Sequence, residues 1–226
     1  MNIINKLQNF NYSFFGGSPL QNVFEFQNQL LTGVNDYEFN NETLRIAVNL
    51  WFGNRAEAIT QYGDISLWNV SKVTDMRQLF LQRSDFNENI SGWDVRNVTN
   101  MAWMFDGAIA FNQPLQEWNV GKVTNMFSMF SHARAFNQPL KEWDVRNVTN
   151  MEYMFAYSYS FNDSDIRHWD ISNVTNMEDM FLDATAFIER FPNANNDPRS
   201  IFISSEINTP IIQRNLMSQF DDTVDE

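Results

Sequence analysis

The hydrophobic positions of this chain repeat about every 25 residues between residues 64 and 190. Each repeat opens with Ile or Leu, and a Trp follows three residues later. The steps between these Trp residues are 25, 25, 25 and 26 residues, and they are Trp68, Trp93, Trp118, Trp143 and Trp169. A unit this short cannot enclose its own apolar side chains, so its copies must stack to bury them. The period predicts a solenoid with the Trp column in its structural core.

The residues around each Trp predict a short β-strand. In the second repeat, Trp93 and Val95 are apolar residues at i and i+2, which share one face of a strand. The residues that follow predict a short helix, because a Thr suited to an N-cap precedes an apolar stripe at i, i+3, i+4 and i+7. That stripe is Met101, Met104, Phe105 and Ala108. Two repeats also show capping-box spacing, in the pairs Thr149 with Glu152 and Thr175 with Glu178.

These patterns together predict an α/β solenoid, a stack of about five strand, turn and short-helix coils over residues 64–190. Residues 41–63 place apolar side chains on one helical stripe and predict a helical N-terminal cap. Residues 191–226 predict a C-terminal cap, with a strand at 200–204, a helix at 210–220 and an acidic tail. We predict that residues 1–40 are a Phe/Asn-rich arm, which either packs on the solenoid or mediates assembly with a neighbour.

Two strings carry a family resemblance: FNQPLQEWNVGKVTNMFSMF at 111–130 and FNQPLKEWDVRNVTNMEYMF at 136–155. They resemble the bacterial surface-protein repeat family of about 26 residues, which is related to the BspA-like leucine-rich repeats. The spacing from Leu115 through Trp118 and Val120 to Val123 also resembles the leucine-rich-repeat strand signature. The resemblance implies a leucine-rich-repeat-like solenoid used for binding or assembly, as in bacterial surface proteins and some large DNA viruses.

Composition narrows the classes of partner. The chain has 28 acidic and 15 basic residues and a formal charge of −13, which opposes binding to nucleic acid or anionic lipid. It contains no Cys, so thiolate metal sites and disulfides are excluded. No stretch approaches the roughly 20 apolar residues of a membrane helix, and residues 1–20 lack the apolar core of a secretory signal. We expect an intracellular or virion-associated protein rather than a secreted one.

A polar column between each Trp and the next Val or Ile is the candidate partner-binding site. Its members point away from the core, and they are Asn69, Asp94, Asn119, Asp144 and Asp170. They form either a solvated ladder that bonds neighbouring backbone or a surface for a partner or a cation. Arg96 and Arg146 lie beside this column, where they either anchor an acidic partner or neutralise nearby acids.

Catalysis finds little support in the chain. Its two histidines, His132 and His168, lack a matching Ser or Asp constellation, and no phosphate-binding glycine motif occurs. The Met columns suit packing at least as well as soft-metal binding. We therefore expect no enzyme, no metal site and no cofactor.

The sequence favours a non-enzymatic protein–protein interaction scaffold that uses the exposed polar column. A structural subunit of a larger assembly, such as a viral capsid or virion layer, is the alternative, with the N-terminal arm clamping a neighbour. An adhesin-like surface protein comes third, because the sequence shows no export signal.

Overall fold

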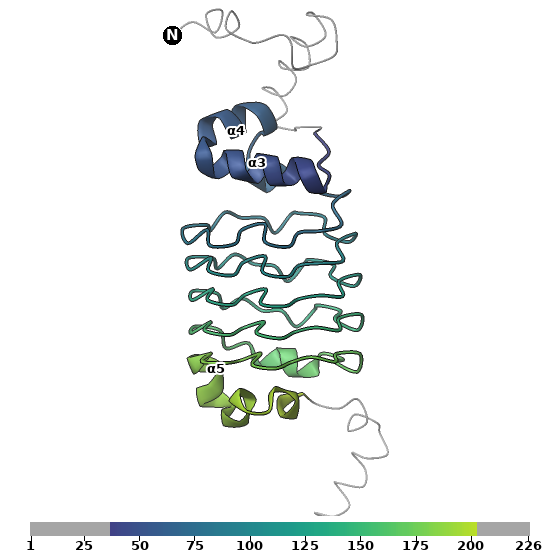
Figure 1. Ribbon diagram of the computed structural model, residues 1–226, viewed down its shortest axis with the longest axis vertical. Helices are drawn as coiled ribbons and strands as arrows, with labels where there is room; N and C mark the ends of the chain where they lie inside the picture. The colour runs from purple at the N-terminus through teal and green to yellow at the C-terminus, as the bar shows by residue number, and fades with distance from the viewer. Residues whose placement is uncertain (1–36, 203–226) are drawn as a thin grey trace, which may run out of the picture. The chain divides into compact units, whose positions relative to one another are not determined.

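Each repeat folds into one looped layer, and five such layers stack in chain order within the described residues (Figure 1). We number them layer 1 (65–89), layer 2 (90–114), layer 3 (115–139), layer 4 (140–165) and layer 5 (166–190). The computed structural model describes residues 37–202. The predicted strand beyond 202, the helix at 210–220, the acidic tail and most of the 1–40 arm lie outside this range.

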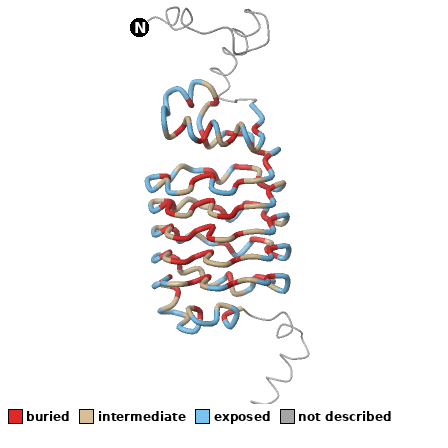
Figure 2. The backbone as a smooth tube through the Cα atoms, in the orientation of Figure 1, coloured by how far each residue is buried: buried red, intermediate tan, exposed pale blue. Residues whose placement is uncertain are grey.

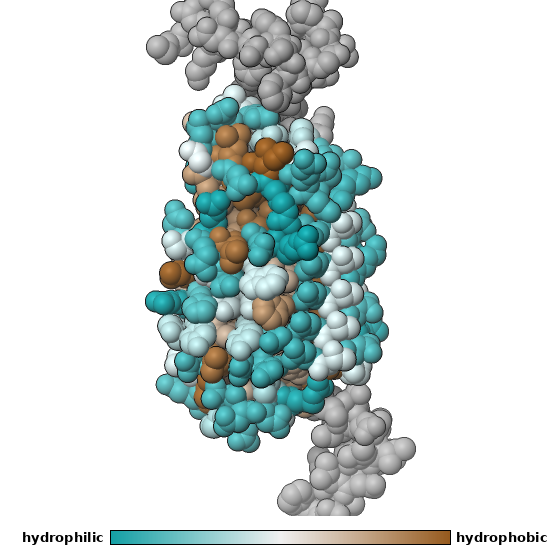
Figure 3. Space-filling view, in the orientation of Figure 1, coloured by the Kyte–Doolittle hydropathy of each residue, from teal (hydrophilic) through white to brown (hydrophobic). Residues whose placement is uncertain are grey.

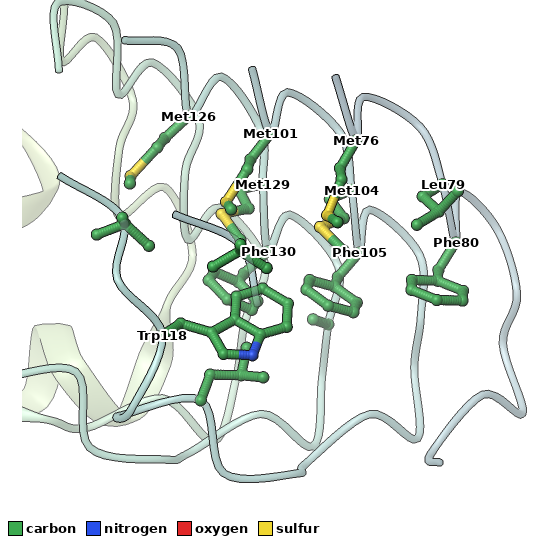
Figure 4. Packing of buried hydrophobic residues seen from close by; sticks show 14 of the residues in the cluster. Met76, Leu79, Phe80, Met101, Met104, Phe105, Trp118, Met126, Met129 and Phe130 are labelled. Carbon is green, nitrogen blue, oxygen red and sulfur yellow. The ribbon is translucent and has the colours of Figure 1, made fainter. Parts of the chain in front are cut away.

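Buried positions recur at equivalent places in successive layers (Figure 2), and their side chains form columns in the interior of the stack. In Figure 4 the methionines of successive layers lie in rows, and the rings of Phe80, Phe105 and Phe130 lie parallel. In that column, which continues with Phe155 and Phe181, successive ring centroids are 5.4 to 5.8 Å apart. A second Phe column lies beside it, and the five repeat Trp residues are only 3 to 4% exposed. Burying each large apolar side chain contributes about 1.5–3 kcal/mol, so the columns dominate stability.

The predicted α/β fold class is wrong, because residues 37–202 contain no β-strand and no sheet. The segment around each Trp forms two successive turns instead. In layer 2 the Trp93 amide donates to the Ile90 carbonyl (3.1 Å) and the Val98 amide to the Val95 carbonyl (2.9 Å). These turns use amides that a strand would offer to its neighbours. Layers are joined by isolated parallel bridges, which link Asp75, Asn100, Asn125, Asn150 and Asn176 in series.

The predicted short helix is also wrong, because left-handed residues interrupt it in every layer. Positive φ recurs at two positions four residues apart, first in Gln78, Trp103, Ser128, Tyr153 and Asp179 and then in Gln82, Gly107, His132, Tyr157 and Asp183. A right-handed helix cannot pass through such residues. Alternate amides donate to the next layer instead: Trp103 to the Phe127 carbonyl (2.8 Å) and Phe105 to the Met129 carbonyl (2.9 Å).

Thr and Asn side chains join the layers. The Thr99 hydroxyl donates to the Thr74 carbonyl of the preceding layer (3.1 Å), and the same bond recurs at each later Thr of this column. Asn87 Oδ1 accepts from the Asn112 amide (3.0 Å), a bond repeated through the next two layers. No helix starts at these Thr residues, so the predicted capping boxes are wrong for Thr149 with Glu152 and for Thr175 with Glu178.

Two helices cover the first layer, α3 (Asn41–Gly53) and α4 (Arg55–Tyr62). Helix α3 buries an apolar stripe made of Leu44, Ala47, Val48 and Trp51. Its polar side chains meet the open backbone edge of layer 1. Asn41 Oδ1 accepts from the Thr74 amide (2.8 Å), and Arg45 Nη1 donates to the Arg77 carbonyl (2.6 Å). Both groups replace the hydrogen bonds that a preceding layer would provide.

Short helices cover the opposite end. The remaining elements are the 3-10 turns η1 (Ile65–Leu67) and η2 (Ser164–His168), the helix α5 (Thr185–Arg190), and the 3-10 turns η3 (Pro192–Asn195) and η4 (Pro198–Ile201). Phe187, Ala194 and Ile201 are buried there, and Arg199 Nη2 donates to the Val174 carbonyl (2.7 Å). Residues 200 and 201 lie in η4, so the strand predicted to begin at residue 200 is wrong at its start.

The left-handed positions predict an unusual effect of glycine. Ser128 has φ 51° and is 6% exposed, and a non-glycine residue in this conformation costs about 1–2 kcal/mol. We expect Ser128→Gly to raise the free energy of unfolding by up to about 1 kcal/mol, because glycine removes this backbone strain. Glycine also raises the entropy of the unfolded chain, which cancels about 0.5–1 kcal/mol of the gain. Urea unfolding measures the difference.

Ser131 provides the matched control, since it is 5% exposed but is not among the positive-φ residues, and its hydroxyl contacts His132 Nδ1 at 2.9 Å. Ser131→Gly should therefore lower stability. Equal destabilisation by the two substitutions would show that the left-handed backbone carries no strain.

Candidate partner-binding surface

The predicted polar column closes turns within its own layers. Asp94 Oδ1 accepts a hydrogen bond from the amide two residues later, that of Arg96 (3.3 Å). The other members make the same bond, and they are Asn69, Asn119, Asp144 and Asp170. This geometry is an Asx turn, which stabilises the local backbone without any ligand.

The two predicted arginines pair with the acids of the same column. Arg96 Nε lies 2.8 Å from Asp94 Oδ1, and Arg146 Nη2 lies 2.8 Å from Asp144 Oδ2. Hydrogen bonding from Arg146 lowers the pKa of Asp144, and hydrogen bonding from Ser172 lowers that of Asp170. The two Arg side chains remain 67 and 68% exposed. Pairs this exposed contribute about 0–1 kcal/mol, so the structure gives the column a local turn-stabilising role.

A row of aromatic side chains on the turn segments of layers 2 to 4 was missed by the sequence analysis. The rings of Trp103 and Phe127 are 4.7 Å apart at 65°, and those of Phe127 and Tyr153 are 6.1 Å apart at 73°. Both are edge-to-face contacts, which favour a fixed arrangement. All three side chains are partly exposed, although the other six tryptophans of the chain are at most 4% exposed.

A second pair of rings lies in layers 3 and 4. His132 stacks on Tyr157 with centroids 4.5 Å apart, and its Nδ1 is 3.6 Å from Asp106 Oδ1. Burial raises the pKa of Asp106, and the nearby His132 opposes that rise. We define the aromatic face as Trp103, Phe127, His132, Tyr153 and Tyr157. Figure 3 shows one side of the stack, where white and brown side chains interrupt the hydrophilic surface across the layers.

The aromatic face departs from the repeat. In the turn segment of each layer, two residues lie between two buried Met or Leu side chains. Both of these residues are polar in the outer layers: Arg77 and Gln78 in layer 1, and Glu178 and Asp179 in layer 5. In the layers between, the same columns supply Trp103, Phe127 and Tyr153. The sequence therefore contained a signal for this surface. The aromatic residues stand at positions that differ among the repeats, and such positions distinguish one region of the surface from the rest.

His132 has a Ser and an Asp neighbour, contrary to the sequence prediction, because the Ser131 hydroxyl and Asp106 Oδ1 lie 2.9 and 3.6 Å from its Nδ1. Among residues 37–202, no group of three or more His, Asp or Glu side chains is placed to hold a metal ion. His168 Nδ1 lies 3.2 Å from the Asp165 carbonyl within η2. In the same part of the chain, none of the helices has the length and apolar character needed to cross a membrane.

The fold and this surface define a class: a repeat protein of stacked turn-built layers that carries one face of non-repeated side chains. A comparison with protein families matches residues 48–164 and 133–202 to the family described as Mycoplasma protein of unknown function, DUF285. The two matches together cover more than half of the chain, which belongs to the DUF285 family. They overlap at 133–164, as expected when similar repeats align in more than one register.

This family assignment corrects the earlier resemblance. The BspA-like 26-residue repeat family is not the one that matches, and the leucine-rich-repeat and solenoid descriptions also fail because the described layers have no strands. The shared spacing of Leu115, Trp118 and Val120 arises here from consecutive turns. Comparisons with curated proteins and with solved structures gave no match.

Proposed function

We propose that this protein is a non-enzymatic scaffold that binds a protein partner through the aromatic face. The observation that carries the proposal is the contact row from Trp103 through Phe127 to Tyr153, in columns where layers 1 and 5 hold polar residues. Trp and Tyr are enriched at interfaces and dominate their binding energy, because large rigid rings bury much area at little entropic cost.

The layers beneath support this reading, because they hold the rings in place. The amides of Trp103 and Tyr153 each donate to the next layer, at 2.8 and 3.0 Å. Met101, Met104 and Phe105, directly beneath the face, are fully buried. A surface built on such a packed support loses little conformational entropy on binding, which favours affinity.

The other expectations stay predictions. The described residues do not test the role of the 1–40 arm in assembly or the virion-subunit and adhesin alternatives. They also do not test an intracellular or virion-associated location. Partner binding by the polar column also stays a prediction, although its acceptor atoms are already used in turns.

The test removes the aromatic face with residues that other layers already carry. Trp103→Ser and Tyr153→Ser copy Ser128, and Phe127→Ala copies Ala102, so the fold should tolerate the triple variant. Immobilised wild-type protein would capture partners from a lysate of the source cells, and purified candidates would then be titrated. We expect the triple variant to lose at least about tenfold in affinity, since interface aromatics contribute about 2 kcal/mol or more each.

The matched control is the triple variant Asp94→Ala, Asp144→Ala and Asp170→Ala, which changes the polar column. It should bind the partner as wild type does. If this control lost binding while the aromatic variant kept it, the polar column rather than the aromatic face would be the binding site. Equal binding by all three proteins would refute both surfaces.

A further inference from the structure

The aromatic face continues into a group of unneutralised carboxylates. The Tyr153 amide donates to the Glu178 carbonyl at 3.0 Å. Interaction with the Asp179 carboxylate, together with the charges of Glu178 and Glu152, raises the pKa of Tyr153. Glu152 Oε2 also accepts from Asn176 Nδ2 at 2.7 Å. We define the acidic edge as Glu152, Glu178 and Asp179. It lies in layers 4 and 5, beside the last ring of the row.

Among the described residues, the acidic edge lacks the ion pairs that several other acids of the stack make. Within residues 37–202, no Arg or Lys comes within ion-pair distance of its three carboxylates. Asp75, Asp94 and Asp144 each pair with an arginine. A further acid, Asp183, lies in the same layer as Glu178. The edge therefore keeps an uncompensated negative charge next to the partly exposed rings.

Neighbouring basic side chains do not compensate it, since Arg146, the closest in sequence to Glu152, pairs with Asp144. Arg134, from layer 3, lies over the ring of Tyr159 at 5.4 Å rather than beside the acidic edge. Tyr159 is 39% exposed and Ile109 is 41% exposed, so apolar surface extends beyond the row of rings. The surface thus presents apolar and aromatic area in layers 2 to 4 and negative charge in layers 4 and 5.

We propose that the partner presents a basic segment with alternating apolar residues, which lies along the stack across the aromatic face and the acidic edge. This inference rests on the proposed function and specifies the partner's chemistry. A Lys or Arg would place its cation near the Tyr153 ring and the carboxylates, a geometry that combines cation–π attraction with ion pairing. Apolar side chains would cover Trp103 and Phe127. The chain's formal charge of −13 would also speed encounter with a cationic partner.

Trp103 makes the test direct, because it is the one tryptophan of the chain that is not buried. Two synthetic peptides serve as probes, one of alternating Leu and Arg and the other of alternating Leu and Glu. We expect the Arg peptide to change the tryptophan fluorescence and to bind at least about tenfold more tightly than the Glu peptide. Added salt should weaken its binding. In Trp103→Phe the fluorescence change should vanish while calorimetry still detects binding.

Charge-removing variants locate the contact. Glu152→Gln, Glu178→Gln and Asp179→Asn together should weaken the Arg peptide about tenfold. The control removes three charges elsewhere, by Asp94→Asn, Asp144→Asn and Asp170→Asn, and should change affinity less than about twofold.

Several outcomes would overturn the basic-partner inference: equal affinity for the two peptides, equal effects of the two variants, or no binding of the Arg peptide at about 1 mM. None of them touches the proposed function, which fails only if the aromatic triple variant retains every captured partner. A self-association that depends on the aromatic face would likewise identify a second copy as the occupant and refute the basic segment.

Discussion

Replacing Trp118 by alanine is expected to lower the free energy of unfolding by about 3–5 kcal/mol. The indole is 3% exposed in the middle of the stack, and its ring lies 6.3 Å from that of Phe105. Layers above and below hold the equivalent Trp93 and Trp143, so the structure cannot collapse into the cavity without disturbing two neighbouring columns. Urea unfolding followed by circular dichroism would measure the loss.

Trp118→Phe separates the two roles of the indole. Its Nε1 donates to the Ile90 carbonyl of the preceding layer at 3.2 Å, and the four other repeat tryptophans also donate to upstream carbonyls. Phenylalanine keeps an aromatic ring but leaves this buried carbonyl without its donor, which costs about 1–3 kcal/mol. Trp103→Phe is the control and should change stability by less than about 0.5 kcal/mol. If both substitutions had the same effect, the indole hydrogen bond would contribute nothing.

Deleting residues 112–136 removes one complete repeat and is expected to leave a shorter folded protein. Phe111 would then be followed by Asn137, which occupies the same column as Asn112, so every buried column stays aligned. Stability of a repeat array is roughly a sum of unit and neighbour terms, so the unfolding midpoint should fall without loss of cooperativity. Denaturant unfolding and near-ultraviolet circular dichroism would show this.

Deleting residues 112–124, about half a repeat, should instead abolish the fold. All columns after the deletion would be displaced, and the layers would place polar residues opposite Trp and Phe. The resulting penalty exceeds the 5–15 kcal/mol that typically stabilises a domain. A cooperative transition in the half-repeat deletion, or none in the full-repeat deletion, would contradict the layered register.

The sequence identifies the columns but not the backbone that carries them. Residues such as Trp93, Met101 and Phe105 recur because each layer has the same buried slot, and this is visible without coordinates. The spacing of Met101, Met104 and Phe105 suits a helix, yet it equally suits consecutive turns with a left-handed residue at Trp103. Gly at such positions would have signalled the conformation, but in the described layers Gly107 alone does so.

The candidate surface was missed for a related reason. The polar column of Asp94 and its equivalents was predicted as the binding site because it repeats in every layer, but its side chains close turns. Trp103, Phe127 and Tyr153 occupy adjacent columns in different repeats, and their contact depends on how far successive layers are offset. That offset is a property of the stacked backbone and could not be obtained from spacing alone.

The direction of the hydrogen bonds makes the two ends of the stack chemically distinct. Layer 1 presents the Asp75 and Arg77 carbonyls, and Arg45 answers them with a cationic donor. Layer 5 presents amides at the equivalent edge, and the Asp179 and Phe181 amides make no hydrogen bond within residues 37–202. If a copy of α3 were grafted onto this edge, the Arg45 guanidinium would face backbone amides, so hydrogen-bond donors would oppose donors. We therefore expect new repeats to be accommodated between the first and last layers, so the array should lengthen by duplication of its internal repeats.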